Sequence, residues 1–112
     1  MNKISFSTNW NNKLDNKVFT TIRPYNPKNY IINEVFEIYH NKNLKGKAKI
    51  IKLDHFDLEV IPEGYCYLDT GYSKKETVEI INKMYSGKVY IVSLIFLKYI
   101  KEEQPPLLTG GC

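Results

Sequence analysis

The chain has 112 residues, of which 43% are hydrophobic and 25% are charged, and its formal net charge at pH 7 is +4. This composition is ordinary for a soluble globular domain and excludes an intrinsically disordered or fibrous protein. The positive charge is compatible with a polyanionic partner but does not establish one.

We expect a single domain over residues 1–100, followed by a flexible tail over residues 101–112, where KEEQPPLLTGGC shows no periodicity. The opening MNKISFSTNW lacks a hydrophobic stretch with a small-residue cleavage site, so the sequence predicts no secretory signal and a cytoplasmic location. The longest apolar run, residues 89–97, is interrupted by Ser93 and is less than half of the roughly 20 residues that a membrane-spanning helix needs. It predicts a core strand, and no membrane partner is expected.

The first half of the chain predicts a strand, a short helix and three further strands. Ile4 and Phe6 alternate in KISFST, as in a strand. Trp10 and Leu14 lie four residues apart, with Thr8 at the N-cap position, which favours a short helix over TNWNNKLDNK. The runs KVFTTIR, NEVFEIYH and GKAKIIKLDHFDLEV are rich in β-branched and aromatic residues and predict strands, the last two joined as a hairpin.

The second half predicts a loop, a helix and a last strand. Pro62, Gly64 and Gly71 indicate a folded loop in IPEGYCYLDTGY. Ser73 and Glu76 form a capping-box pattern at the start of SKKETVEIINKMY, the clearest helix. KVYIVSLIFLKY is apolar on both faces, so we expect a central strand. Residues expected to pack in the core are Val78, Ile81, Met84 and Tyr85 of the helix and Ile91, Ile95 and Leu97 of the strand.

This element order predicts an α+β protein built as a small mixed β-barrel with two helices. Consecutive strands without regular βαβ alternation argue against a parallel doubly wound sheet. Closure of the sheet would remove its exposed edges. Cys66 has no second cysteine or histidine at metal-ligand spacing, so we expect a buried, inert thiol, no metal site and no cofactor.

The segment NKVFTTIRPYNP gathers polar side chains that mark a candidate site. In an extended strand one face carries Lys17, Phe19, Thr21 and Arg23, and the other, which is the better core face, carries Val18, Thr20 and Ile22. Arg23 can bind a phosphate or carboxylate through two hydrogen bonds, and Lys17 adds a second positive charge. The alternative is a solvated strand face whose threonines simply favour β geometry.

The runs ISFSTNWNNKLDNKVFTTIR, NEVFEIY, SKKETVEIINKMY and VYIVSLIFLKY, within residues 4–99, resemble a small ASCH protein of the PUA-like superfamily, particularly the short bacterial and phage-type members. In that family a motif G-x-K-x-x-E/T-x-R lines a cleft in a β-barrel. Lys17 and Arg23 match the motif, with Asn16 in place of the glycine and one extra residue between them. Counting from either end selects Thr20 or Thr21 for the E/T position.

The resemblance implies RNA, a nucleotide or a modified nucleoside as the partner. A short subfamily removes the acyl group from N4-acetylcytidine with a Lys, a Thr and a Glu. In this chain Lys17 would be the base and Thr21 would supply the reacting hydroxyl, because Thr21 shares the strand face of Arg23. Thr20 is the alternative to Thr21. The carboxylate would be Asp69, with Glu63 as the alternate.

Two further groups of residues favour nucleic acid. Tyr65, Tyr67 and Tyr72 would flank the cleft in the family topology, where they can stack on a base. Lysines 42, 45, 47, 49 and 52 in NKNLKGKAKIIK can track a phosphate backbone or protect a hairpin edge from aggregation.

Three functions therefore follow from the sequence. The first is an RNA- or nucleotide-binding module with a basic cleft, the second is an N4-acetylcytidine-type amidohydrolase, and the third is a protein-interaction or inhibitor module. A carboxylate within hydrogen-bond distance of Lys17 and Thr21 would favour catalysis over binding.

Overall fold

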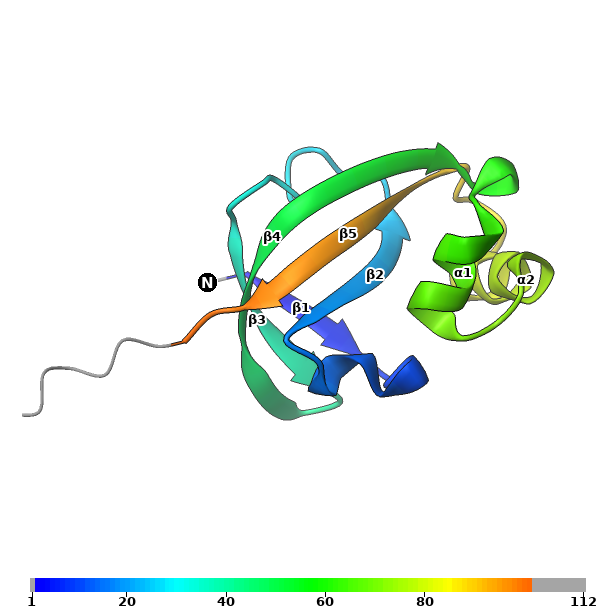
Figure 1. The fold of residues 1–112 in the computed structure, drawn as a ribbon. Helices are drawn as coiled ribbons and strands as arrows, with labels where there is room; N and C mark the ends of the chain where they lie inside the picture. The colour runs from blue at the N-terminus through cyan, green and yellow to red at the C-terminus, as the bar shows by residue number, and fades with distance from the viewer. Residues whose placement is uncertain (1, 102–112) are drawn as a thin grey trace, which may run out of the picture.

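A computed structural model describes residues 2–101 of the chain (Figure 1). The strands are β1 (Lys3–Phe6), β2 (Val18–Pro24), β3 (Val35–His40), β4 (Asn43–Asp57) and β5 (Ile91–Tyr99). The helices are two 3-10 segments, η1 (Trp10–Asp15) and η2 (Leu58–Val60), and two α-helices, α1 (Glu63–Thr70) and α2 (Lys74–Met84). Of the expected tail, residues 102–112 lie outside the described residues.

The five strands form one mixed sheet in the order β1-β3-β4-β5-β2. β1 runs parallel to β3, and the other pairs are antiparallel. The sheet curls into a half-barrel, so that its two edge strands approach each other, and Arg23 Nη2 on β2 donates a hydrogen bond to the Ser5 carbonyl on β1 at 2.9 Å. The predicted α+β class and the mixed strand directions are confirmed, but the sheet is a half-barrel rather than the expected closed barrel, and the described residues contain more helical segments than the two expected.

Apolar side chains form two clusters, one on each face of the sheet. The inner cluster, within the curl, consists of Ile4, Phe6, Leu14, Phe19, Phe36, Ile38, Ala48, Ile50, Ile95 and Leu97. The second consists of Leu58, Ile61, Cys66, Ile81 and Val92, with Val78 and Tyr85 of α2 packed against it. The helices α1 and α2 therefore cover one end of the outer face, as Figure 1 shows.

Two residues expected in the core are exposed. Met84, the last residue of α2, is 57% exposed, whereas the next residue, Tyr85, packs against the second cluster. Ile91 is 45% exposed because it begins β5, where the inner cluster no longer reaches. The other predicted core residues of the last strand, Ile95 and Leu97, are fully buried.

The predicted loop over IPEGYCYLDTGY is wrong, because this segment contains α1. Pro62 occupies the N-cap, and Gly71 follows the last turn with a left-handed φ of 78°, donating its N–H to the Tyr67 carbonyl. Proline before a helix and glycine after it are boundary signals rather than loop signals. Ser73 is confirmed as the N-cap of the next helix, since the Glu76 N–H donates to Ser73 Oγ at 3.2 Å, and Ser73 Oγ donates in turn to Glu76 Oε1 at 3.0 Å.

The hairpin of β3 and β4 is confirmed, and its turn is tighter than the whole NKNLKG segment. His40 pairs with Asn43, which leaves Asn41 and Lys42 as a two-residue connection. Asn41 adopts a φ of 56°, a conformation that asparagine tolerates and that such turns require. No helix in the described part of the chain has the length and hydrophobicity to cross a bilayer.

Candidate functional site

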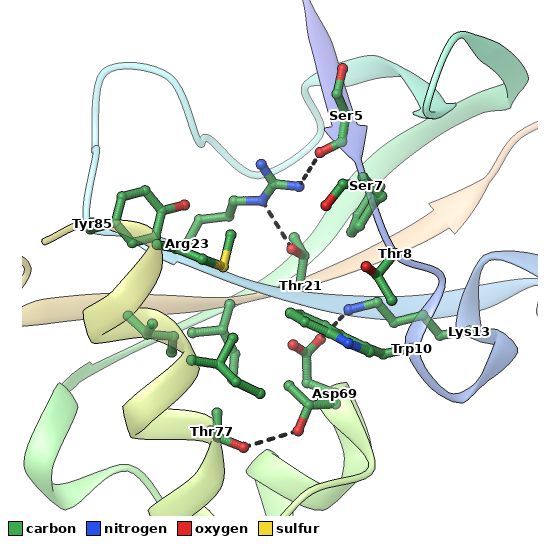
Figure 2. A pocket seen from close by; sticks show the side chains of 16 residues that line it. Ser5, Ser7, Thr8, Trp10, Lys13, Thr21, Arg23, Asp69, Thr77 and Tyr85 are labelled. Carbon is green, nitrogen blue, oxygen red and sulfur yellow. Dashed lines mark hydrogen bonds and ion pairs between the residues drawn. The ribbon is translucent and has the colours of Figure 1, made fainter.

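A pocket opens beside β2, between the end of β1, η1 and the two α-helices (Figure 2). About 580 Å³ of space free of protein atoms lies within it and its mouth. Its lining comprises Ser5, Phe6, Ser7, Thr8, Trp10, Lys13, Thr21, Ile22, Arg23, Asp69, Thr70, Thr77, Ile80, Ile81, Met84 and Tyr85. The enclosed part of this space is only about 80 Å³, below the roughly 300–1,000 Å³ of typical small-molecule sites, so a larger ligand would extend into the open mouth.

Lys13 reaches the pocket because the predicted helix over TNWNNKLDNK is a kinked 3-10 segment. Asn11 and Asn12 adopt left-handed φ values of 60° and 52°, which asparagine tolerates better than most residues. The kink places Lys13 next to Leu14 inside the protein, with 4% and 1% exposure. The structure assigns the N-cap to Asn9 rather than Thr8, and Asn9 Oδ1 accepts a hydrogen bond from the Leu14 N–H.

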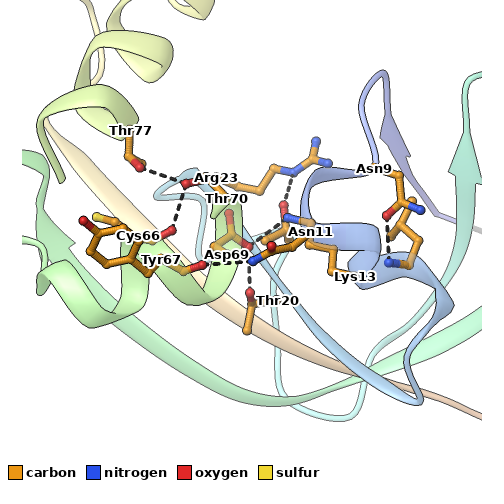
Figure 3. Close-up of polar contacts among 12 residues, drawn as sticks. Asn9, Asn11, Lys13, Thr20, Arg23, Cys66, Tyr67, Asp69, Thr70 and Thr77 are labelled. Atoms are coloured by element: carbon orange, nitrogen blue, oxygen red, sulfur yellow. Dashed lines mark hydrogen bonds and ion pairs between the residues drawn. The ribbon is translucent and has the colours of Figure 1, made fainter. Parts of the chain in front are cut away.

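Lys13, Asp69 and Thr20 form a buried polar cluster (Figure 3). Asp69 Oδ1 accepts hydrogen bonds from Lys13 Nζ at 2.9 Å and from Thr20 Oγ1 at 2.7 Å. Asp69 is 1% exposed and lies in the last turn of α1, where the helix dipole disfavours a negative charge. The ammonium of Lys13 offsets this cost, so the ion pair holds η1 against α1.

Burial lowers the pKa of Lys13 below its ordinary value. The charge and hydrogen bond of Asp69 act in the opposite direction, and the positive charge of Arg23 lowers the pKa further. The direction is therefore set by desolvation, which disfavours the charged ammonium. The Lys13 amine thus loses its proton more readily than a surface lysine does.

Arg23 forms the opposite wall of the pocket (Figure 2). Its Nε donates to Thr21 Oγ1 at 3.0 Å and its Nη2 donates to the Ser5 carbonyl at 2.9 Å. The guanidinium carbon lies 4.9 Å from the ring centroid of Phe6, and Lys13 Nζ lies 5.2 Å from the same centroid. Two cations therefore flank one aromatic ring at the site.

Hydrogen bonds between the two α-helices stiffen the floor of the pocket. Thr70 Oγ1 donates to the Cys66 carbonyl at 2.8 Å and lies 2.9 Å from Thr77 Oγ1. Because the Thr70 proton is used by Cys66, Thr77 is the donor in the second bond. The thiol of Cys66 is buried as predicted, and burial raises its pKa, so it stays protonated.

The structure brings together part of the predicted site. Thr21, Arg23 and Asp69 line the pocket, and Thr20 joins them through Asp69. Both threonines are buried because β2 is covered on its two faces. The expected core face of this strand is thus corrected: Phe19 lies in the inner core, whereas Val18 is 43% exposed.

Besides Thr20, which does not line the pocket itself, five predicted site residues lie outside it. Lys17 is exposed and lines a separate groove with Lys49 and Lys98. Glu63 is exposed in the first turn of α1. The three tyrosines do not gather at one place, because a helix replaces the expected loop. Tyr65 packs against Phe56 with ring centroids 5.6 Å apart, while Tyr67 and Tyr72 are 50% and 41% exposed.

The sequence interpretation missed Lys13 and Trp10 as site residues. Trp10 and Leu14 were expected to form the apolar stripe of a short helix, and Lys13 was not considered as a site residue. The adjacent pair Asn11-Asn12 was the available signal, because such a pair marks a position where a helix can kink. Asp69 therefore meets a lysine and a threonine as the catalytic hypothesis requires, but they are Lys13 and Thr20 rather than Lys17 and Thr21.

Comparison of the chain with protein-family models, curated proteins and solved structures gives no match. Across residues 2–101, no group of three or more His, Cys, Asp or Glu side chains is placed to hold a metal ion. The functional proposal therefore rests on the geometry of the pocket.

Proposed function

We propose that the pocket binds a nucleotide, either free or as part of a single-stranded RNA, in the manner of an ASCH-type module of the PUA-like superfamily. The observation that carries this proposal is Arg23, whose side chain lines the pocket. Thr21 and Ser5 take two of its five N–H donors. The other donors can bind a phosphate, and the two bonds already made hold the guanidinium in position.

The aromatic side chains of the pocket suit the base of such a ligand. Phe6, Trp10 and Tyr85 line it, and Lys13 Nζ lies 5.7 Å from the Trp10 ring centroid. Stacking on aromatic side chains contributes about 1–3 kcal/mol per base. Thr21 and Asp69 supply polar atoms that can read the edge of the base.

Arg23→Ala is expected to weaken the binding of a nucleoside monophosphate by roughly 1.5–3 kcal/mol, or about 10- to 150-fold, because a charge-assisted hydrogen bond is lost. Melting temperature should fall as well, since the variant loses the bond that joins β2 to Ser5 on β1. Isothermal titration calorimetry measures the affinity. Lys17→Ala is the matched control, because it removes a cation of the same motif outside the pocket, and an equal loss in both variants would contradict the proposal.

A second function, hydrolysis of an N4-acylated cytidine, is supported by the cluster of Lys13, Asp69 and Thr20. In this reaction water replaces the amino group on the acyl carbon, giving a carboxylic acid and the free amine. The hydroxyl that faces the pocket attacks the acyl carbon, and a lysine with a lowered pKa accepts its proton and passes it to the departing cytidine amine; water then cleaves the acyl ester and releases the acid. A carboxylate 2.9 Å from the lysine Nζ keeps the lysine amine oriented. The hydroxyl that faces the pocket is that of Thr21.

The two threonines are expected to differ in their effect on hydrolysis. Thr21→Val should abolish it at nearly constant volume, and Thr21→Ser should retain part of it, because only the pocket-lining hydroxyl meets the substrate. Thr20→Val should have a smaller effect, since Thr20 acts only through Asp69. Mass spectrometry of a panel of N4-acylated cytidines gives the products. The reverse order would assign the reacting hydroxyl to Thr20.

A further inference from the structure

A groove lined by lysines lies away from the pocket, at one end of the sheet. Among residues 2–101 its lining consists of Lys17, Lys49, Lys98, Tyr99, Ile100 and Lys101, with no carboxylate. The end of β5 that carries it is opposite the end covered by α1 and α2 (Figure 1). We call these four lysines the outer lysine surface.

The register of the sheet places like charges against each other in this surface. Lys98 on β5 lies directly opposite Lys49 on β4 and opposite Val18 on β2. Like charges at directly opposed positions destabilise a sheet. Within residues 2–101, none of the four lysines forms an ion pair, whereas Lys45 pairs with Asp15 nearby. The surface therefore concentrates positive charge that an external anion can neutralise.

We propose that the outer lysine surface binds the phosphate backbone of single-stranded nucleic acid. The cations are spread over adjacent strands, which are about 4.8 Å apart, so they can meet successive phosphates rather than a single ion. Tyr99 is half-buried, and its hydroxyl is held by the Leu14 carbonyl at 2.8 Å. Because Tyr99 and Ile100 do not protrude, the groove lacks the apolar anchors that a membrane-surface site uses.

This inference does not depend on the ligand of the pocket. Phosphate contacts carry no sequence information, so the surface should bind a strand that lacks bases as well as one that has them. Recognition of a base would remain the property of the pocket around Arg23.

The test compares a labelled oligouridylate with an abasic strand of equal length by fluorescence anisotropy over a range of salt concentrations. In the variant Lys49→Gln/Lys98→Gln, affinity for both strands should fall. The slope of log K against log salt should become shallower by about 1.4, since each lost contact to a single strand contributes about 0.7. The matched control is Lys83→Gln/Lys88→Gln, which removes two exposed charges elsewhere and should leave the slope unchanged.

Further measurements test whether the outer lysine surface acts separately from the pocket. A saturating nucleoside monophosphate, which occupies the pocket, should not displace the abasic strand, which separates this surface from the pocket. Equal losses of affinity in the Lys49/Lys98 variant and in its control would show that only net charge matters, and would overturn the proposal. Binding to phosphatidylserine vesicles without binding to either strand would overturn it as well. The melting temperature of the Lys49/Lys98 variant should equal or exceed that of the wild type, because repulsion is relieved. A lower value would contradict the proposed repulsion.

Discussion

Asp69→Asn is expected to lower the free energy of unfolding by about 3–5 kcal/mol at pH 7, which is typical of breaking a buried ion pair. The amide keeps the shape of the side chain but removes the negative charge 2.9 Å from Lys13 Nζ. Lys13 is 4% exposed, so its ammonium would remain buried without a counter-ion. Urea denaturation measures the change. A cost below about 1 kcal/mol would show that Lys13 reaches solvent without Asp69.

The cost of Asp69→Asn should shrink as the pH rises. Burial lowers the pKa of Lys13, and Asp69 opposes this shift, so removing Asp69 lowers the pKa further. Between the folded-state pKa and the ordinary lysine value, the unfolded chain binds more protons than the folded one, so the free energy of unfolding rises with pH. This window is wider in the variant. The difference in the free energy of unfolding between the wild type and the variant should therefore shrink by up to about 1.4 kcal/mol per pH unit. A difference that grows with pH would contradict this prediction.

The double variant Lys13→Met/Asp69→Leu separates the charges from the packing. It replaces both charged groups by apolar side chains of comparable size, and such replacements of a buried ion pair are often neutral or stabilising. We expect it to be more stable than Asp69→Asn and than Lys13→Met, each of which leaves one buried charge unpaired. With Asp69→Leu as the second single variant, a double-mutant cycle gives the coupling energy of the pair.

Local patterns were sufficient to predict most of the fold. The capping pattern of Ser73 and Glu76 predicts the start of α2, and it depends only on two residues three positions apart. The largely apolar character of β5 follows from its place between two neighbours, with side chains buried on both faces. The error at α1 arose because Pro62 and Gly71 mark the two ends of a short helix, and the same residues also mark loops.

The candidate site was harder to predict because it depends on contacts between distant segments. Lys13 and Asp69 are 56 residues apart and meet only because Asn11 and Asn12 kink η1 toward α1. The motif on β2 did place Thr21 and Arg23 at the pocket. Lys17 matches the same motif in sequence, but it precedes β2 and lines a separate groove, so spacing alone assigned the wrong lysine to the pocket.

Lys13 is expected to have the largest effect on catalysis if the pocket hydrolyses an N4-acylated cytidine. Loss of a general base typically costs about 10²- to 10⁴-fold in rate. Lys13→Met/Asp69→Leu keeps the packing of the site and should lose hydrolysis to this extent, while Arg23 continues to bind nucleotides. Lys17→Gln should hydrolyse as the wild type does, because Lys17 does not line the pocket.

The pH dependence of the rate distinguishes a base from a merely structural lysine. Because a base must be neutral, the rate should rise with pH as Lys13 loses its proton, and burial moves this rise below the ordinary pKa of lysine. The melting temperature of each variant, measured in parallel, separates a loss of activity from a loss of fold. If Lys17→Gln were inactive and the Lys13/Asp69 variant hydrolysed normally, the base would be Lys17, and the buried pair of Lys13 and Asp69 would serve only to join η1 to α1.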